Sequence, residues 1–266
     1  MLDFALSLAR EAGAVLQSFF EEELEVRSKS AEIDLLTQAD LASEEFILGR
    51  IRKQFPTHAI LSEEAGESGT HEYYWVVDPL DATVNFAHGV PHYCVSIGLR
   101  RGLETVLGVA YDPERDELFW AERGAGACLR YGDGSERRLQ VSATQSLGES
   151  LLATGFPYDR ATNPANNLAE FNRVILRVQG VRRAGSAALD LAYVAAGRYD
   201  GYWEYRMKPW DTVAASLMVI EAGGALSTLD GGPWDPWHET TVAANPTLLP
   251  VLVAALNGRE ARTQTP

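Results

Sequence analysis

The feature that most constrains this chain is a short apolar run that ends in two aspartates. Residues 75–86 read WVVDPLDATVNF. The aromatic and β-branched segment Tyr73–Val77 predicts a buried strand. Asp78 lies where that strand is expected to end, and Pro79 is expected to stop further ladder pairing. The pattern therefore predicts a carboxylate at the rim of a buried sheet, which is costly unless a positive charge meets it.

More oxygen ligands follow directly in the sequence. Asp81 and Thr83 add a second carboxylate and a hydroxyl group within the turn after the strand. A hard divalent cation such as Mg²⁺ takes oxygen ligands from a few carboxylates plus substrate phosphate. The segment therefore predicts a divalent-cation site.

Three further acidic segments extend this prediction. In SEEAG, Glu63 and Glu64 follow an expected strand at 59–61, and in PWDTVAA, Asp211 precedes an apolar helix. The segment KSAEIDLLTQAD adds Lys29, Asp34 and Asp40. Each segment has an ordinary alternative, because charged pairs are mostly exposed and an aspartate before a helix is a common N-cap.

Composition narrows the classes of partner and compartment. The formal net charge of −14 argues against nucleic acid, whose affinity rests on Lys and Arg. No apolar run is long enough to span a bilayer, so no membrane partner is expected. The N-terminal 20 residues lack a basic leader and include Asp3, which argues against a signal peptide. Cys94 and Cys128 are too few for a disulfide framework, so two reduced, buried thiols and a cytoplasmic location are expected.

The first half of the chain predicts helices packed on an antiparallel sheet. Helical patterns cover residues 2–20 and 40–55. In the second helix, the side chains expected to face the core are Leu41, Leu48, Ile51 and Phe55. Closely spaced strands without intervening helices indicate antiparallel pairing. These strands are expected at Tyr73–Val77, Cys94–Leu99, Thr105–Tyr111, Leu118–Ala121 and Ala127–Arg130.

The second half alternates between strands and helices. Strands are expected at Ser150–Thr154, Gly201–Glu204, Ala225–Thr228 and Thr241–Ala244. Helices are expected at Asn166–Arg177, Ser186–Ala196, Thr212–Ala222 and Thr247–Leu256. The change in rhythm predicts two lobes, residues 1–140 and residues 141–266.

Taken together, the acidic segments resemble the inositol monophosphatase family, which are Mg²⁺-dependent, lithium-sensitive phosphomonoesterases. The family pattern is Glu-Glu after a strand, then D-P-x-D-x-T-x-N-F, then W-D before a helix that ends in a glycine pair. This chain has Glu63-Glu64, residues 78–86, Trp210-Asp211 and Gly223-Gly224 in the same order. The resemblance covers roughly residues 29–245, and its combined motif is highly specific. It implies an α/β (α+β) fold, a layered αβαβα sandwich whose antiparallel sheet lobe precedes a smaller mixed α/β lobe.

The resemblance also implies metals and catalytic roles. Two or three Mg²⁺ ions would bind, with Mn²⁺ as an alternative and with Ca²⁺ and Li⁺ as inhibitors. Thr83 would orient the attacking water with Asp40 hydrogen-bonded behind it, and Glu63 would help to accept the proton of that water. The metal ligands would be the side chains of Glu63, Asp78, Asp81 and Asp211 and the backbone carbonyl of Leu80.

Substrate contacts follow from the same resemblance. Glu204 matches the acidic residue that binds a ring hydroxyl, and carboxylates suit that task as acceptors. For Gly185 and Ser186, an ordinary turn and helix cap is the alternative. The implied substrate contacts are Asp81, Ala82, Thr83, Gly185, Ser186, Ala187, Glu204 and Asp211.

The resemblance implies a homodimer that hydrolyses myo-inositol 1-phosphate or a close analogue. Rival substrates are fructose 1,6-bisphosphate, histidinol phosphate and a 3′-phosphonucleotide. A regulatory protein that contacts the transcription machinery is the rival from a different class. A non-catalytic relative would be expected to lose at least one carboxylate, whereas here the set is complete.

One residue departs from the family pattern. The family usually has Gly where this chain has Ala82. At negative φ the alanine costs little, whereas at positive φ it strains the turn by about 1 kcal/mol or more.

Overall fold

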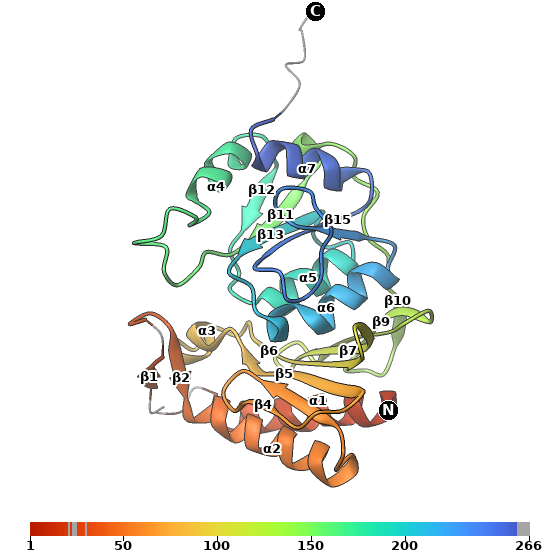
Figure 1. Cartoon of the computed structure of the whole chain (residues 1–266). Coiled ribbons are helices and arrows are strands. Elements are labelled where there is room, and N and C mark those ends of the chain that lie inside the picture. Colours follow the sequence, from red (N-terminus) through yellow and green to blue (C-terminus); the bar gives the residue numbers. More distant parts are fainter. Residues whose placement is uncertain (21, 23–25, 30, 260–266) are drawn as a thin grey trace, which may run out of the picture.

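The computed structural model describes residues 1–20, 22, 26–29 and 31–259, and these form five layers (Figure 1). Helices α1 (Leu2–Gln17) and α2 (Gln38–Gln54) cover the outer face of an eight-stranded sheet. Helices α5 (Ala187–Ala195) and α6 (Pro209–Glu221) lie between this sheet and a five-stranded sheet. The layer order confirms the expected αβαβα sandwich, whereas the boundary near residue 140 stays a prediction.

The larger sheet is mostly antiparallel, as the sequence predicts. Its strands run in the order β10-β9-β8-β7-β6-β5-β3-β4, and every neighbouring pair from β5 to β10 is antiparallel. Its strands are β3 (Ala59–Ser62), β4 (Gly66–Ser68), β5 (Tyr73–Asp81), β6 (Cys94–Arg101), β7 (Glu104–Asp112), β8 (Glu117–Glu122), β9 (Gly126–Tyr131) and β10 (Glu136–Arg138).

Strands β3 and β5 pair in parallel, which the sequence patterns do not reveal. Parallel strands bring their carboxyl ends to the same edge of a sheet. The Glu63 N–H, just past β3, donates to the Val77 carbonyl at 3.2 Å. The parallel pairing therefore brings the Glu63-Glu64 pair beside the aspartates at the end of β5.

Strand β5 does not end at Asp78, so the expectation that Pro79 stops the strand is wrong. The strand continues to Asp81, and its register against β6 shifts between Asp78 and Asp81. Proline is tolerated in a sheet at such an irregularity, because its missing N–H costs no ladder bond there. A short helix, α3 (Thr83–Ala87), follows at once.

The second sheet is mixed and has the order β12-β11-β13-β15-β14. Its strands are β11 (Leu151–Thr154), β12 (Gly180–Arg182), β13 (Gly201–Tyr205), β14 (Ala225–Ser227) and β15 (Thr240–Ala244). Strand β11 pairs in parallel with β12 and β13, and β12 was not expected from the sequence. Helices α4 (Leu168–Ile175) and α7 (Leu248–Leu256) lie on its outer side (Figure 1). A separate hairpin joins β1 (Val26–Ser28) to β2 (Leu35–Thr37).

Helix α6 packs very closely on the larger sheet. A Cβ at Gly108 in β7 would overlap with the backbone carbonyl of Ala214, so only glycine fits there. This contact fixes α6, and with it Asp211, against the sheet. On the outer helix α2, Leu48 and Ile51 are buried as expected, but Leu41 is 46% exposed and does not face the core.

Two smaller expectations concern the cysteines and the membrane. Cys94 and Cys128 are buried and free, as predicted. Among the described residues, no helix has the length and apolarity that crossing a bilayer requires.

Candidate active site

Two adjoining cavities lie between the halves of the chain. The first, which we call the acidic cavity, has a volume of about 480 Å³. The second, which we call the inner cavity, has a volume of about 120 Å³. Asp81 and Asp211 line both cavities.

The cavities bring together nearly all the residues that the sequence singled out. Those lining the acidic cavity are Lys29, Asp34, Glu63, Glu64, Asp78, Leu80, Asp81, Ala82, Thr83 and Asp211. Those lining the inner cavity are Asp81, Gly185, Ser186, Ala187, Glu204 and Asp211. Asp40 lines neither cavity and lies directly behind Thr83.

The carboxyl groups of the acidic cavity perturb one another. Burial raises the pKa of Asp78 well above its ordinary value, and the charges of Glu63, Asp81 and Asp211 raise it further. Burial raises the pKa of Asp211 as well, and Glu63 and Asp81 again add to the effect. Carboxyl groups this close resist simultaneous ionisation unless positive charge joins them. The donor set therefore suits hard divalent cations, which bind carboxylate oxygens.

Lys29 contributes the positive charge that the structure places at these acids. Its Nζ lies 2.8 Å from Glu63 Oε1 and also pairs with Glu64. Glu64 could be either an acidic partner of the site or an exposed surface residue. The structure favours the first alternative, because the side chain of Glu64 is only 11% exposed. Lys29 is thus ion-paired with both glutamates.

The carboxyl groups do not form a closed coordination shell as they stand. Within the described part of the chain, no three His, Cys, Asp or Glu side chains converge tightly enough to hold an ion. Protein donors engage several of the oxygens: Lys29 contacts Glu63, and Ser186 donates to Asp81. A cation bound here would compete with these donors for the carboxylate oxygens.

Thr83 and Asp40 form the hydrogen-bonded pair that the resemblance implies. The Thr83 hydroxyl lies 2.8 Å from Asp40 Oδ1 and 3.2 Å from the Leu80 carbonyl oxygen. Because the carboxylate is the closer and stronger acceptor, the single hydroxyl proton is directed to Asp40. The Thr83 oxygen then keeps its lone pairs for a proton of water.

Other residues, which the sequence analysis missed, hold these groups in place. Both the N–H and the hydroxyl of Thr37 donate to Asp40 Oδ2, at 2.8 and 2.6 Å. Glu44 Oε1 accepts the N–H groups of Glu64 and Ala65, at 3.1 and 2.9 Å. Asp40 and Glu44 are four residues apart and thus share one face of α2. Two buried acids at this spacing in an amphipathic helix are the sequence signal for such a role.

The sequence left open that Asp211 is an ordinary N-cap of its helix, but it does not occupy that position. The N-cap of α6 is Lys208, and Asp211 lies in the first turn. Its Oδ2 accepts the Lys208 N–H at 2.7 Å. Helix α6 begins earlier than expected because Pro209 has the φ that the first helical position favours. The result is a carboxyl group tied to the helix start and facing both cavities.

Ala82 occupies the left-handed region, with φ 80° and ψ 46°. Of the two alternatives set out above, the strained one therefore holds. In this region an L-residue other than Gly, Asn or Asp costs roughly 1–2 kcal/mol. The turn between the two cavities thus keeps its shape at the expense of backbone strain.

Relief of this strain is measurable as stability. Ala82→Gly is expected to raise the free energy of unfolding by about 1 kcal/mol through relief of strain. The greater conformational entropy that glycine gives the unfolded chain offsets part of this gain. Denaturant unfolding followed by circular dichroism measures it. The exposed helical Ala14 in α1 is the control, and Ala14→Gly is expected to lower stability by about 1 kcal/mol. Equal losses in both variants would contradict the strain at residue 82.

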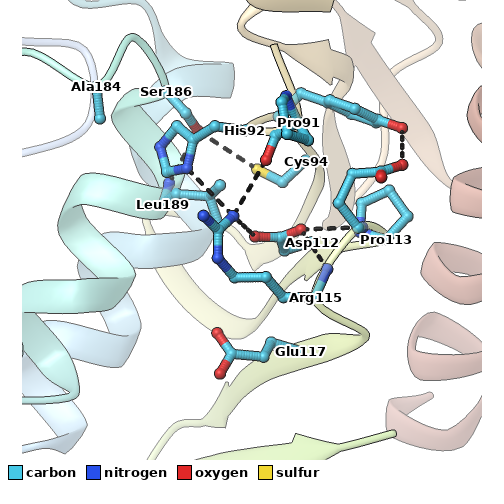
Figure 2. Close-up of polar contacts among 12 residues, drawn as sticks. Pro91, His92, Cys94, Asp112, Pro113, Arg115, Glu117, Ala184, Ser186 and Leu189 are labelled. Carbon is cyan, nitrogen blue, oxygen red and sulfur yellow. Dashed lines mark hydrogen bonds and ion pairs between the residues drawn. The ribbon is translucent and has the colours of Figure 1, made fainter. Parts of the chain in front are cut away.

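The inner cavity begins where Asp81 meets the start of α5. Asp81 Oδ2 accepts the Ser186 hydroxyl at 2.5 Å and the Ala188 N–H at 2.8 Å. Ser186 is also the N-cap of α5, because its hydroxyl oxygen accepts the Leu189 N–H. The buried Cys94 thiol lies 3.7 Å from the Ser186 hydroxyl (Figure 2). The cap alternative for Ser186 therefore holds together with its position in the cavity wall.

Asn85 ties the segment before Ser186 to the motif that carries the aspartates. Its amide group donates to the carbonyls of Ala184 and His92, at 2.8 and 2.7 Å. Figure 2 shows His92 and Arg115 beside Asp112. The two halves of the site are therefore connected by hydrogen bonds at Asp81 and at Asn85.

Glu204 forms another wall of the inner cavity. Burial raises the pKa of Glu204 to about 7, and the Tyr202 hydroxyl, which donates to it, opposes this shift. A Cβ at Gly155 would overlap with the carboxyl group of Glu204, so glycine is required there. The inner cavity is therefore lined by the carboxyl group of Glu204 as well as by the start of α5.

Comparison with known proteins agrees with this architecture. A profile of the Inositol monophosphatase family matches residues 1–260. An inositol-1-monophosphatase of Synechocystis sp. is 45% identical over 236 residues, which are 88% of this chain and 80% of that protein. A Nus factor SuhB of Pseudomonas aeruginosa is 45% identical over 239 residues, which are 87% of this chain and 86% of that protein.

Solved structures of such proteins have the same fold. The inositol monophosphatase of Anabaena (Nostoc) sp. has a TM-score of 0.85 and 43% identity, covering 99% of this chain and 98% of that one. The extragenic suppressor protein suhB of Bartonella henselae has a TM-score of 0.88 and 39% identity, with the same coverage. On its sequence, its fold and its gathered carboxylates, the chain belongs to the inositol monophosphatase family and is a phosphatase.

Proposed function

We propose that this chain is a Mg²⁺-dependent phosphomonoesterase that hydrolyses myo-inositol 1-phosphate, or a close analogue, to inositol and phosphate. One observation carries the proposal: the acidic cavity and the inner cavity share Asp81 and Asp211. A phosphate group held in the first cavity would place its alcohol in the second. The relative from Synechocystis sp., which bears the name inositol-1-monophosphatase, supports the substrate class.

The residues of the acidic cavity fit divalent cations. A phosphate monoester dianion is repelled by these carboxylates until cations reverse the local field. Bound ions would polarise the ester and lower the pKa of a bound water. The groups that would hold them are the side chains of Glu63, Asp78, Asp81 and Asp211 and the carbonyl of Leu80.

The chain's own residues would direct the attacking water. Because Asp40 engages the Thr83 hydroxyl proton, the Thr83 oxygen is an acceptor that holds one O–H of the water. Burial raises the pKa of Glu63, with Glu64 and Asp40 adding to the effect, while Lys29 opposes it. A carboxylate with a raised pKa is a better proton acceptor near neutral pH. Glu63 would therefore take the proton as the water oxygen bonds to phosphorus.

The leaving alcohol would be recognised in the inner cavity. The bond between phosphorus and the ester oxygen would break, and that oxygen would take a proton from solvent water and leave as an inositol hydroxyl. Glu204 would accept a hydrogen bond from a ring hydroxyl, while Gly185, Ser186 and Ala187 would line the ring. Ala82 and Thr83 would contact the phosphate from the turn that joins the cavities.

A substrate panel tests this proposal. With Mg²⁺ present, phosphate release is measured on inositol 1-phosphate, fructose 1,6-bisphosphate, histidinol phosphate and a 3′-phosphonucleotide. Inositol 1-phosphate is expected to have the highest kcat/KM, by about tenfold or more, because buried acceptors reject alcohols that leave them unpaired. The Asp211→Asn variant, purified in parallel, reports any contaminating phosphatase. Should inositol 1-phosphate be the poorest substrate, the assignment is wrong.

We further propose that Mn²⁺ can replace Mg²⁺, that Ca²⁺ and Li⁺ inhibit the enzyme, and that the chain forms a homodimer in the cytoplasm. A Nus factor SuhB is as similar to this chain as an inositol-1-monophosphatase is, so sequence identity does not separate a regulatory role from the enzymatic one.

A further inference from the structure

Asp190 is an ionisable residue in the inner cavity that the mechanism above does not use. It lies on α5, is 2% exposed and lines the cavity together with Glu204. Its Oδ1 is fully buried and accepts no hydrogen bond from the described residues. No Lys, Arg or His in the described chain forms an ion pair with it at 4.0 Å or less. Asp190 is therefore a buried acceptor without a protein donor.

Such a group costs folding stability. Burial raises the pKa of Asp190 well above its ordinary value, and the neighbouring carboxylates of Glu204 and Asp81 raise it further, while the charge of Arg183, which lines the same cavity, opposes the shift. Asp112, which is equally buried, shows how the fold usually treats a carboxyl group. Asp112 accepts the N–H groups of Glu114 and Arg115 and pairs with the Arg115 guanidinium (Figure 2). An unpaired acid at a cavity wall points to a donor that arrives with a ligand.

The chemistry of the cavity identifies that donor. A carboxylate accepts hydrogen bonds, so its partner must present an N–H or O–H group. A phosphate group does not qualify, because it is itself anionic and acceptor-rich. The Ser186 hydroxyl is engaged by Asp81, and the Tyr202 hydroxyl by Glu204. The hydroxyl groups of a polyol are donors of the right kind, and they would enter this cavity in the proposed reaction.

We propose that Asp190 is a specificity-determining residue whose carboxyl group accepts a hydrogen bond from a second hydroxyl of the polyol, beside the hydroxyl bound by Glu204. This inference rests on the proposed function, because it needs the alcohol of the substrate in the inner cavity. It assigns the site to substrates with at least two hydroxyls near the ester. A monohydric phosphate ester would leave Asp190 unpaired and gain nothing from it.

The competing explanation is structural. A negative charge in the first turn of a helix interacts favourably with the helix dipole, and Asp190 lies in the first turn of α5. The two explanations predict opposite effects on stability. If Asp190 serves the helix, its neutralisation lowers the unfolding temperature. If it serves the substrate, removing a buried unpaired acid leaves the unfolding temperature unchanged or raises it.

The experiment compares Asp190→Leu and Asp190→Asn with the wild type in the presence of Mg²⁺. Two substrates are used: myo-inositol 1-phosphate and p-nitrophenyl phosphate, whose leaving group carries no further hydroxyl. We expect Asp190→Leu to raise KM for inositol 1-phosphate about tenfold or more, with kinetics on p-nitrophenyl phosphate within about twofold of the wild type. Asp190→Asn keeps one acceptor oxygen, so its KM for inositol 1-phosphate is expected to lie between those of the wild type and Asp190→Leu.

Stability is measured on the same samples, with Asp112→Asn as the matched control. Asp112→Asn is expected to lower the unfolding temperature because it removes the ion pair with Arg115 and weakens the hydrogen bonds to the carboxylate. Asp190→Asn is not expected to lower the unfolding temperature, because no such contacts are lost. If Asp190→Leu does not fold, Asp190→Asn alone carries both measurements. An equal loss of kcat/KM on both substrates, or a fall in unfolding temperature at residue 190, overturns the inference.

The outcomes separate this inference from the proposed function. A wild type that is inactive on inositol 1-phosphate overturns the proposed function and the inference with it. A wild type that hydrolyses inositol 1-phosphate, with Asp190 variants that do so equally well, overturns only the role of Asp190.

Discussion

Replacement of Asp211 with Asn should lower the rate of phosphate release by about a thousandfold, to near the background of the assay. Asp211 lines both cavities, so its carboxylate would hold cation on one side and face the alcohol on the other. A catalytic metal contributes several kcal/mol to the stabilisation of the transition state, and about 4 kcal/mol corresponds to a thousandfold in rate. The measurement is kcat on inositol 1-phosphate at saturating Mg²⁺.

The same variant should remain folded and become more stable at alkaline pH when no cation is present. Asn Oδ1 can still accept the Lys208 N–H that anchors Asp211. Because the pKa of Asp211 is raised above its ordinary value of 3.8, the carboxyl group favours folding at low pH, and this contribution is lost as the pH rises through the raised pKa. The variant's advantage in unfolding temperature should therefore grow with pH.

Glu221, at the other end of α6, provides the matched control. Its carboxylate accepts the N–H groups of Gly124 and Gly126, away from both cavities. Glu221→Gln changes the charge of the same helix by the same amount, and its kcat is expected to match the wild type. Unchanged turnover in Asp211→Asn would refute the role of Asp211 as a metal ligand.

Removal of divalent cations should abolish phosphate release altogether, and addition of Mg²⁺ should restore it. The carboxyl groups around Asp78 repel one another and would repel a phosphate dianion, so the acidic cavity has little affinity for substrate without cations. Protein dialysed against EDTA is assayed before and after addition of excess Mg²⁺. EDTA already saturated with Mg²⁺ controls for effects of the chelator itself.

Metal removal also has a readout that does not depend on activity. Mg²⁺ that binds only the folded chain raises its unfolding temperature in a concentration-dependent manner. This increase should be smaller in Asp211→Asn, which lacks one of the carboxylates. Full activity after exhaustive dialysis against EDTA would exclude the cation requirement.

Much of the site was predictable because it is encoded locally. The buried strand β5 is visible in the sequence as an apolar run, although the strand continues past Asp78 to Asp81. The short connections after β5 leave antiparallel pairing as the natural arrangement. The free cysteines and the stop of α6 before Gly223 follow from equally local patterns.

The rest depends on contacts between distant segments. The parallel pairing of β3 with β5 joins strands that no short-range pattern links, and it alone explains why Glu63 meets Asp78. The positive φ of Ala82 comes directly after the register shift in β5, and an alanine gives no sign of it. Asp190 stands out in the sequence only as a single acid in an apolar helix; its lack of a donor emerges from the folded cavity.

The contact between Gly108 and the backbone of α6 has a consequence for how this protein can change over evolution. Where main chain rests on main chain, no side chain is available to shrink or swell in compensation for a neighbour's mutation. Drift at residue 108 would displace the helix that carries Asp211, although the glycine has no functional group of its own. We therefore expect substitutions to be poorly tolerated even at positions such as Gly108, which take no part in the chemistry and only allow a helix and a strand to pack backbone against backbone.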